Sequence, residues 1–234
     1  MWNGKMKALT FSYDDGVTQD RRLIEIFNKY GLKCTFNLNS ELFGKENSLV
    51  RDGVEIRHDK VLPSEVKSLY AGHEIAAHTL KHPSLVKLED DEEVIRQVEE
   101  DRKNLSALAG YEVVGFAYPG GSINCNSHVA ELIRENTGIK YARGTVSTHS
   151  FDAQTDMYLF NPTVYHHVEM DKMFELGREF LALKPDAPKY FYIFGHAYEF
   201  DIRNEWDRFE EFCAMMSGRD DIFYGTNRQV LLGE

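Results

Sequence analysis

Short apolar segments alternate with amphipathic segments from one end of the chain to the other. The apolar segments have the length of buried strands, and they predict strands at 6–13, 33–39, 73–78, 112–119, 139–144, 189–196 and 221–226. The amphipathic segments carry apolar residues at helical spacing, and they predict helices at 18–31, 62–72, 87–110, 126–138, 171–183 and 204–218. Residues 145–163 follow neither period, so we expect a long irregular loop there.

Residues that begin and end helices agree with these limits. Thr18 is a candidate N-cap for the first helix, and Gly31 is a C-terminal stop. Acidic residues crowd the first turn of the helix predicted at 87–110, where they favour the positive end of the helix dipole. Gly110 is placed to end that helix.

Strands that alternate with helices imply crossover connections and therefore a parallel sheet, either a barrel or a doubly wound layer. The sequence shows no internal repeat, no low-complexity segment and no linker that divides it. A chain of 234 residues is within the range of one large α/β domain. We therefore expect residues 1–234 to form a single domain.

Composition and charge exclude several classes of protein. The net charge of −11 argues against nucleic acid and against an anionic membrane surface as partners. No apolar run is long enough to span a bilayer, and the first residues lack the apolar region of a signal peptide. Three cysteines without a C-x-x-C spacing indicate free thiols in a reducing compartment. The expected location is the cytoplasm, and the oligomeric state stays open.

Polar residues of unusual type stand at the ends of three predicted strands. The first strand ends in Asp14-Asp15, the third leads into His78 and His82, and the aromatic strand ends at His196. In a parallel α/β fold, functional side chains gather at the carboxyl ends of the strands. Two histidines and one carboxylate from separate strand ends form a recognisable site for a divalent metal with an open position.

Two adjacent acids can divide the work of such a site. Because successive side chains diverge, one can bind the metal while the other takes a proton from water, whose pKa falls to about 7 at catalytic zinc sites. Each motif also has a plain structural interpretation. Taken alone, Asp14-Asp15-Gly16 is compatible with an acidic turn, and the histidine pair with two surface side chains.

These residues together resemble the polysaccharide deacetylase family, the NodB-homology or carbohydrate esterase family 4 proteins. The first family motif, T-F-D-D-G, corresponds to Ser12-Tyr13-Asp14-Asp15-Gly16, and the second, H-[ST]-x-x-H, to His78-Thr79-Leu80-Lys81-His82. The resemblance implies a distorted (β/α) barrel of about seven parallel strands. It makes Asp14 the general base and Asp15, His78 and His82 the ligands of one divalent metal, with zinc first and cobalt or nickel as alternatives.

The later motifs match less completely. The third, F-R-x-P-[YF]-G, reads Phe116-Ala117-Tyr118-Pro119-Gly120-Gly121, so Ala117 replaces the arginine that orients the base in the family. By the resemblance Gly120 supplies an oxyanion N–H, Tyr118 and Pro119 join it in substrate binding, and Arg143 is a candidate substitute for the lost arginine. The fourth motif, an Asp-Trp pair, has no match, although Asp152 and Asp156 lie in the corresponding stretch.

The fifth motif, L-x-H, corresponds to Phe194-Gly195-His196 and implies that His196 is the general acid. Tyr198 and Glu199 follow it, and Glu199 either lines the substrate cleft or caps the next helix. The remaining histidines in loops or on helix faces are expected to be solvated: His58, His128, His149, His166 and His167.

The function implied by the resemblance is metal-dependent hydrolysis of N-acetyl, or also O-acetyl, groups of a carbohydrate. The expected substrate is an acetylated oligosaccharide or amino sugar. Two alternatives stay open, because the third and fourth motifs depart from the family. One is a metal-dependent hydrolase of a non-sugar C–N amide bond, and the other is an inactive relative that binds glycans.

Overall fold

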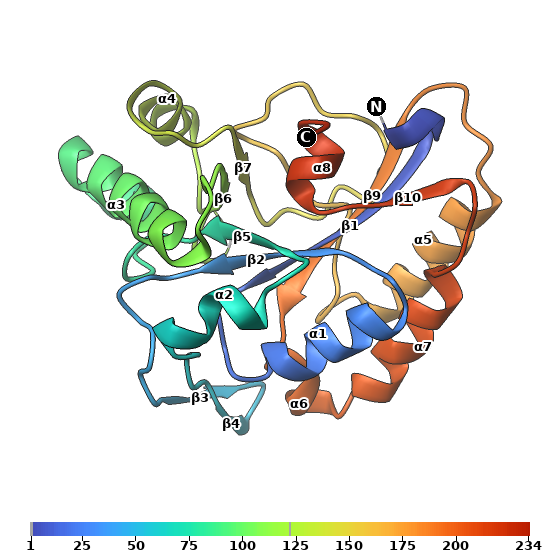
Figure 1. The fold of residues 1–234 in the computed structure, drawn as a ribbon, viewed down its shortest axis with the longest axis horizontal. Coiled ribbons are helices and arrows are strands. Elements are labelled where there is room, and N and C mark those ends of the chain that lie inside the picture. Colours follow the sequence, from blue (N-terminus) through green and yellow to red (C-terminus); the bar gives the residue numbers. More distant parts are fainter. Residues whose placement is uncertain (1, 122) are drawn as a thin grey trace.

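A curled sheet of parallel strands occupies the centre of the computed structural model, which describes residues 2–121 and 123–234 (Figure 1). Within these residues, seven strands follow one another in the order β7-β6-β5-β2-β1-β9-β8, and β10 also pairs with β1. The strands are β1 (Lys7–Asp14), β2 (Cys34–Leu38), β5 (Glu74–Ala77), β6 (Gly115–Ala117), β7 (Tyr141–Arg143), β8 (Val164–Tyr165), β9 (Lys189–His196) and β10 (Ile222–Tyr224). The fold is the distorted α/β barrel of parallel strands that the sequence predicts.

Strand β1 lies in the middle of the sheet and sets the register of the site. It pairs with β10 near its start and with β2 near its end, while β9 runs beside its whole length. At the carboxyl end of β1, Asp14 stands opposite Asn37 of β2 and opposite His196 of β9. The first and last candidate catalytic residues are therefore neighbours across one strand pair.

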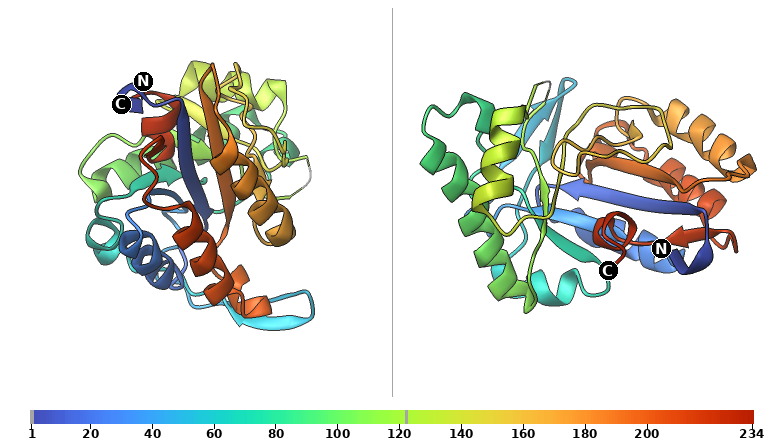
Figure 2. Two further views of the ribbon diagram at one scale, coloured as in Figure 1. Left: turned by 90° about the vertical axis from the view of Figure 1, so that its right-hand side faces the viewer. Right: turned by 90° about the horizontal axis from the view of Figure 1, so that it is seen from above.

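The helices cover the outside of the sheet (Figures 1 and 2). Helices α3 and α4 lie together on one side, and α1, α5 and α7 lie on the other (Figure 1). A small antiparallel hairpin, β3–β4, projects beside α6 (Figure 2). The helices and the hairpin are α1 (Asp20–Lys29), β3 (Ser48–Arg51), β4 (Val54–Arg57), α2 (Val66–Leu69), α3 (Asp91–Ala109), α4 (Ser127–Asn136), α5 (Met170–Ala182), α6 (Glu199–Arg203), α7 (Trp206–Met216) and α8 (Asn227–Leu231).

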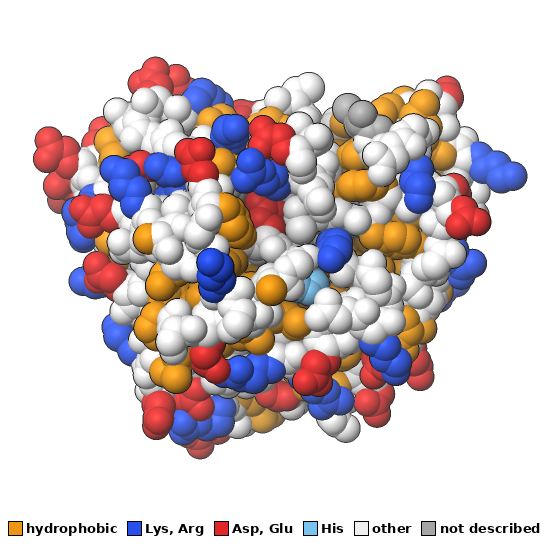
Figure 3. Space-filling view, in the orientation of Figure 1, with side chains coloured by type: hydrophobic (Ala, Val, Ile, Leu, Met, Phe, Trp, Pro, Cys, Tyr) orange, Lys and Arg blue, Asp and Glu red, His pale blue; other side chains and the backbone are white. Residues whose placement is uncertain are grey.

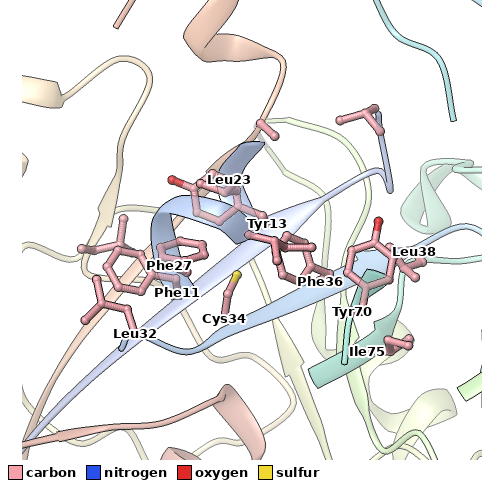
Figure 4. Close-up of a cluster of buried hydrophobic side chains, with 14 of the residues drawn as sticks. Phe11, Tyr13, Leu23, Phe27, Leu32, Cys34, Phe36, Leu38, Tyr70 and Ile75 are labelled. Carbon is pink, nitrogen blue, oxygen red and sulfur yellow. The ribbon is translucent and has the colours of Figure 1, made fainter. Parts of the chain in front are cut away.

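Aromatic and aliphatic side chains from the sheet and from α1 form the main core (Figure 4). The rings of Phe11 on β1 and Phe27 on α1 lie 4.7 Å apart, and Phe36 on β2 packs at 4.8 Å against Tyr70 after α2. All four side chains are buried. Full burial of one such side chain contributes about 1.5–3 kcal/mol, so this layer holds β1 and β2 firmly under the site.

Most predicted elements are confirmed, with shifts at their ends. The first helix begins at Asp20, with Gln19 at the cap position, because the Thr18 hydroxyl contacts Gln19 Oε1 and caps no helical N–H. The helix predicted at 87–110 begins at Asp91, since the Asp90 side chain accepts from the Glu92 N–H, and it ends at Gly110 as expected.

Other predictions differ more from the structure. The helix predicted at 62–72 is divided into a 3₁₀ turn, Pro63–Glu65, and the short α2. The strand predicted at 112–119 is paired only over Gly115–Ala117. The hairpin β3–β4, strand β8 and helices α6 and α8 were not predicted.

The surface carries charges of both signs. Lysine and arginine side chains are interspersed with aspartate and glutamate on the face shown in Figure 3. The two ends of the described chain lie close together (Figure 2), where the Trp2 indole Nε1 donates to the Val230 carbonyl at 2.9 Å. None of the helices in 2–121 or 123–234 is long and apolar enough to cross a membrane.

Candidate active site

One cavity of about 320 Å³ opens at the carboxyl ends of the strands. Its floor brings together the five polar residues that the sequence singles out, from the ends of β1, β5 and β9. The lining residues are Asp14, Asp15, Arg51, His78, His82, Gly120, Gly121, Thr145, Tyr165, Phe194, His196 and Tyr198. The motifs that are far apart in the sequence thus share one pocket.

Asp14 is a buried carboxylate with a dedicated cation. The Arg143 guanidinium at the end of β7 donates to both Asp14 carboxylate oxygens, at 2.5 and 2.6 Å. The Asn37 amide donates to Asp14 Oδ1 at 2.7 Å. Burial opposes ionisation, but the Arg143 charge outweighs it and lowers the pKa of Asp14. Asp14 is therefore ionised at neutral pH and held rigidly in place.

Asp15 occupies a strained backbone conformation directly after β1. Its φ is +85°, in the left-handed region that residues with a Cβ rarely adopt. The Lys60 ammonium donates to the Asp15 carbonyl at 2.6 Å and lies 3.5 Å from Oδ1, while His58 Nε2 lies 3.2 Å from Oδ2. Burial raises the pKa of Asp15, but Lys60 and then His58 reverse this and lower it well below its usual range.

The segment from His78 to His82 makes one sharp turn at Leu80 and Lys81. Thr79 and His82 both have positive φ, +70° and +63°, and such strain collects at functional sites. The Asn39 amide donates to the carbonyls of His78 and Thr79 at 2.6 and 2.9 Å. The Asp101 carboxylate of α3 accepts from the His78 N–H at 2.9 Å. The fold thus keeps a backbone shape that the sequence alone disfavours.

The His78 ring is arranged as a metal ligand. Its Nδ1 lies 2.7 Å from the Ala117 carbonyl, which can only accept, so Nδ1 carries the proton. The other nitrogen, Nε2, is buried without a hydrogen-bond partner among the described residues. Burial lowers the pKa of His78 to about 4, which keeps the ring neutral. A neutral ring whose far nitrogen is anchored to a carbonyl is the form in which histidine binds metals.

Asp15, His78 and His82 offer one ligand atom each within 4.8 Å of one another. One carboxylate and two imidazoles suit zinc and related divalent ions, with a position left for water or substrate. The unpartnered His78 Nε2 is the observation that fits a metal best, because a buried polar atom without a partner costs free energy.

His196 lies beside the two acids on the cavity floor. Its Nε2 is 4.0 Å from the nearer carboxylate oxygens of both Asp14 and Asp15. The ring Nδ1 of His196 lies 3.0 Å from Glu199 Oε1, and the backbone N–H of His196 donates to Glu199 Oε2 at 3.0 Å. Burial lowers the pKa of His196, but the Glu199 carboxylate outweighs it and raises the pKa to about 8.

Other residues assigned from the sequence take different positions. Gly120 lines the cavity as expected, but Tyr118 is fully buried, with its hydroxyl on the Tyr158 carbonyl, and neither it nor Pro119 lines the cavity. Both residues follow the end of β6 and are buried, and their expected part in substrate binding stays a prediction. Arg143 and Glu199 lie behind Asp14 and His196 rather than at the cavity surface.

The acids considered for the fourth motif do not reach the site. Asp152 pairs with Lys189 at the opposite end of β9 from His196, and Asp156 pairs with Arg134. Neither acid of this loop therefore approaches the cavity. The carboxylate beside His196 is Glu199, three residues along the chain.

Three histidines are less exposed than the sequence suggests. His166 and His167 are buried, because they follow the short strand β8 under α6, and His58 is largely covered beside Asp15. His128 and His149 are exposed, as predicted. Sequence reasoning also missed Arg51 and Tyr165 in the cavity wall. The apolar residues before Tyr165 were the available signal, but they are too few to indicate a strand.

Comparison with known proteins adds a family and a fold. The family model for polysaccharide deacetylase matches residues 3–142, more than half of the chain. A putative polysaccharide deacetylase from Mycobacterium smegmatis is similar over 97% of this chain and 89% of its own, with a TM-score of 0.65 and 19% identity. No curated protein matches the chain.

Two further solved structures share the fold at low identity. A family 4 carbohydrate esterase from Streptomyces lividans, in complex with acetate, covers 95% of this chain and 92% of its own, at a TM-score of 0.55 and 14% identity. The Xyl-CE4 domain of a multidomain xylanase from the hindgut metagenome of Trinervitermes trinervoides covers 98% and 90%, at a TM-score of 0.59 and 15% identity.

Proposed function

This chain belongs to the polysaccharide deacetylase family, and from that premise we propose that it is a metal-dependent hydrolase that removes N-acetyl groups from a carbohydrate. One observation carries the proposal. The donor set Asp15, His78 and His82 opens into the same cavity as a cation-paired carboxylate, Asp14, and a carboxylate-paired imidazole, His196.

Asp15, His78 and His82 would hold the metal, with zinc first and cobalt or nickel as alternatives. A bound divalent ion makes water more acidic and polarises a carbonyl group, which together favour attack on an amide. The chain's part is to present the three donors already deprotonated: the Asp15 carboxylate is ionised, and burial lowers the pKa of both His78 and His82.

The remaining side chains move protons. Asp14 accepts the proton of the attacking water, since Arg143 keeps it ionised and fixes its direction. The Gly120 backbone N–H is the candidate donor to the oxyanion, at the cavity wall. His196 gives a proton to the departing nitrogen, because its pKa of about 8 leaves it protonated at neutral pH.

The size of the cavity favours a small substrate. About 320 Å³ is at the lower end of the range for small-molecule sites, which suits one acetylated amino sugar or the end of an oligosaccharide. Gly120 and Gly121 at the altered third motif leave one wall without side chains. That wall favours a second candidate, a non-sugar amide or an O-acetyl ester. An inactive glycan-binding relative is less compatible with a site that keeps base, donors and acid together.

The first experiment is a metal analysis of the purified protein beside His82→Ala. We expect about one divalent ion per chain, as for other single catalytic sites, and its loss in the variant. Acetate release is then measured on N-acetylated and O-acetylated sugars and on small amides. Asp14→Asn should lower the rate by about 10²–10⁴-fold, the usual worth of acid–base catalysis. A protein that takes up no metal after reconstitution with zinc would contradict the proposal.

A further inference from the structure

Glu199 is a fully buried carboxylate with partners on every side. It lies at the start of α6, three residues after His196, and none of its surface is exposed. Glu199 Oε2 accepts from the backbone N–H of His196, and Glu199 Oε1 lies 3.0 Å from the ring Nδ1 of His196. The Tyr165 hydroxyl also donates to Oε1, and His166 Nε2 lies 3.6 Å from Oε2. A buried charge with so many partners has a single position.

The cation that compensates Glu199 comes from the projecting hairpin. Arg51, the last residue of β3, places a guanidinium nitrogen 2.6 Å from Glu199 Oε1. The same guanidinium donates to the hydroxyls of Tyr165 and Tyr198 at 2.6 and 3.2 Å. Without this cation, ionised Glu199 would depend on His196 and the neutral ring of His166, whose pKa burial lowers to about 3.

Asp52, the next residue of the hairpin, joins the hairpin to α6. The Asp52 carboxylate accepts from Arg203 at 3.2 Å and lies 3.2 Å from His167 Nε2. Arg203 is the last residue of α6, the helix that begins with Glu199. Both ends of α6 are thus tied to the hairpin, Glu199 through Arg51 and Arg203 through Asp52.

We propose that Arg51 and Glu199 are positioning residues that hold His196 as the acid for an amine leaving group, so that the β3–β4 hairpin completes the catalytic site. This inference rests on the proposed function. The negative charge of Glu199, 3.0 Å from His196 Nδ1, favours a proton on that nitrogen, although the two atoms are not aligned for a hydrogen bond. The outer Nε2–H then faces the cavity, where Asp14 and Asp15 mark the reacting centre.

The step served by this pair is cleavage of the C–N bond. The tetrahedral carbon collapses to acetic acid, the electron pair of the C–N bond goes to nitrogen, and His196 Nε2 gives that nitrogen its proton. Acetic acid and Asp14 then release the two protons of the attacking water, and His196 takes up one of them, so that both residues return to their starting states. An aryl oxide such as 4-nitrophenolate leaves without protonation, so ester substrates of this kind do not need the acid.

The test compares an amide with an activated ester in the zinc-loaded protein. Acetate release is measured from N-acetylated chitooligosaccharides and 4-nitrophenolate release from 4-nitrophenyl acetate. The variants are Glu199→Gln, Arg51→Met and Arg51→Lys, with His196→Ala as the reference for loss of the acid. Arg57→Met is the matched control, because Arg57 lies on the same hairpin and pairs with Asp59 and Glu46 outside the cavity.

We expect Glu199→Gln and Arg51→Met to lower amide turnover by about 10²-fold, the lower end of the range for general acid catalysis, while ester turnover stays close to wild type. Arg51→Lys should restore part of the amide rate, and Arg57→Met should change neither. Equal losses on both substrates, or no loss on the amide, would overturn the inference.

The two proposals fail in different ways. A wild-type protein without zinc-dependent activity on any acetylated sugar, amide or ester would refute the proposed function, and the inference with it. A wild type active on the amide, with Arg51→Met unchanged, would refute only the role of the hairpin. Thermal melting of each variant identifies losses that arise from unfolding, and the Arg51→Lys variant then decides the result.

Discussion

At the scale of single residues, the departures from the family motifs are compensated by side chains from other strand ends. Ala117 stands where the third motif has an arginine, yet Asp14 is paired with Arg143 from the next strand. The sequence could suggest Arg143, because it ends the strand after the third motif. It could not show the contact, since the distance depends on how far the sheet curls between β1 and β7.

The Asp14–Arg143 pair gives a prediction about stability. Both side chains are buried, with exposures of 3% and 1%. Arg143→Met leaves a buried carboxylate uncompensated, and breaking such a pair costs about 3–5 kcal/mol. Urea unfolding should show this loss. Adding Asp14→Asn removes the unpaired charge, so the double variant should be more stable than Arg143→Met alone. A double variant that is no better would mean that Arg143 acts through packing only.

His166 gives a prediction about pH. Burial lowers its pKa to about 3, whereas the pKa of an unfolded histidine is about 6.5. Between these two pH values His166 is protonated in the unfolded chain but not in the folded chain. The free energy of unfolding therefore falls as the pH decreases below 6.5. At pH 5 the loss from this residue is about 2 kcal/mol.

The measurement is urea unfolding of metal-free protein at pH 7 and pH 5, for wild type and His166→Gln. The variant should lose less stability than wild type between these two pH values. The variant still loses the part of the stability that depends on neutral His73 and His78, because burial lowers the pKa of each to about 4. An unchanged pH dependence in the variant would show that His166 is not the titrating group.

At the scale of elements, periodicity predicts the buried strands and the long helices but not the parts that close the site. Strand β3 alternates exposed and half-buried positions and β4 buries only Ile56, so the hairpin has no apolar run to detect. Helices α6 and α8 have five residues each, too short for a period to be recognised. Arg51 and the buried state of Glu199 were missed for this reason, since both depend on packing between the hairpin and α6.

The turn that carries the histidine pair gives a prediction about metal affinity. Asn39, directly after β2, holds the carbonyls of His78 and Thr79, in a turn with two positive φ angles. Asn39→Ala frees this backbone and lets the donors drift apart. We expect zinc affinity to fall by about 10–100-fold, as for other losses of an outer partner. Competition with a chelating dye measures this, and an unchanged affinity would show that the turn keeps its shape without Asn39.

At the scale of the whole molecule, the site exists only when the parallel sheet has assembled. Asp14 and His196 are far apart in the sequence but adjacent in register, and the motif order predicts this meeting only through the resemblance to a family. The net charge of −11 contrasts with Lys60, Arg51 and Arg143, which are all directed at the acids around the cavity. These three cations thus compensate carboxylates that the fold buries.

The dependence of the site on the assembled sheet predicts that metal stabilises the folded state. Asp15 follows β1 and the two histidines follow β5, with β2 between these strands, so the three donors meet only in the folded chain. A ligand that binds only this state adds about 2.7 kcal/mol at a hundred times its dissociation constant. Zinc should therefore raise the thermal midpoint of wild type and leave His82→Ala unchanged. Because His82 is 35% exposed, its loss should alter the metal-free midpoint little. An equal rise in both proteins would place the bound zinc at another site.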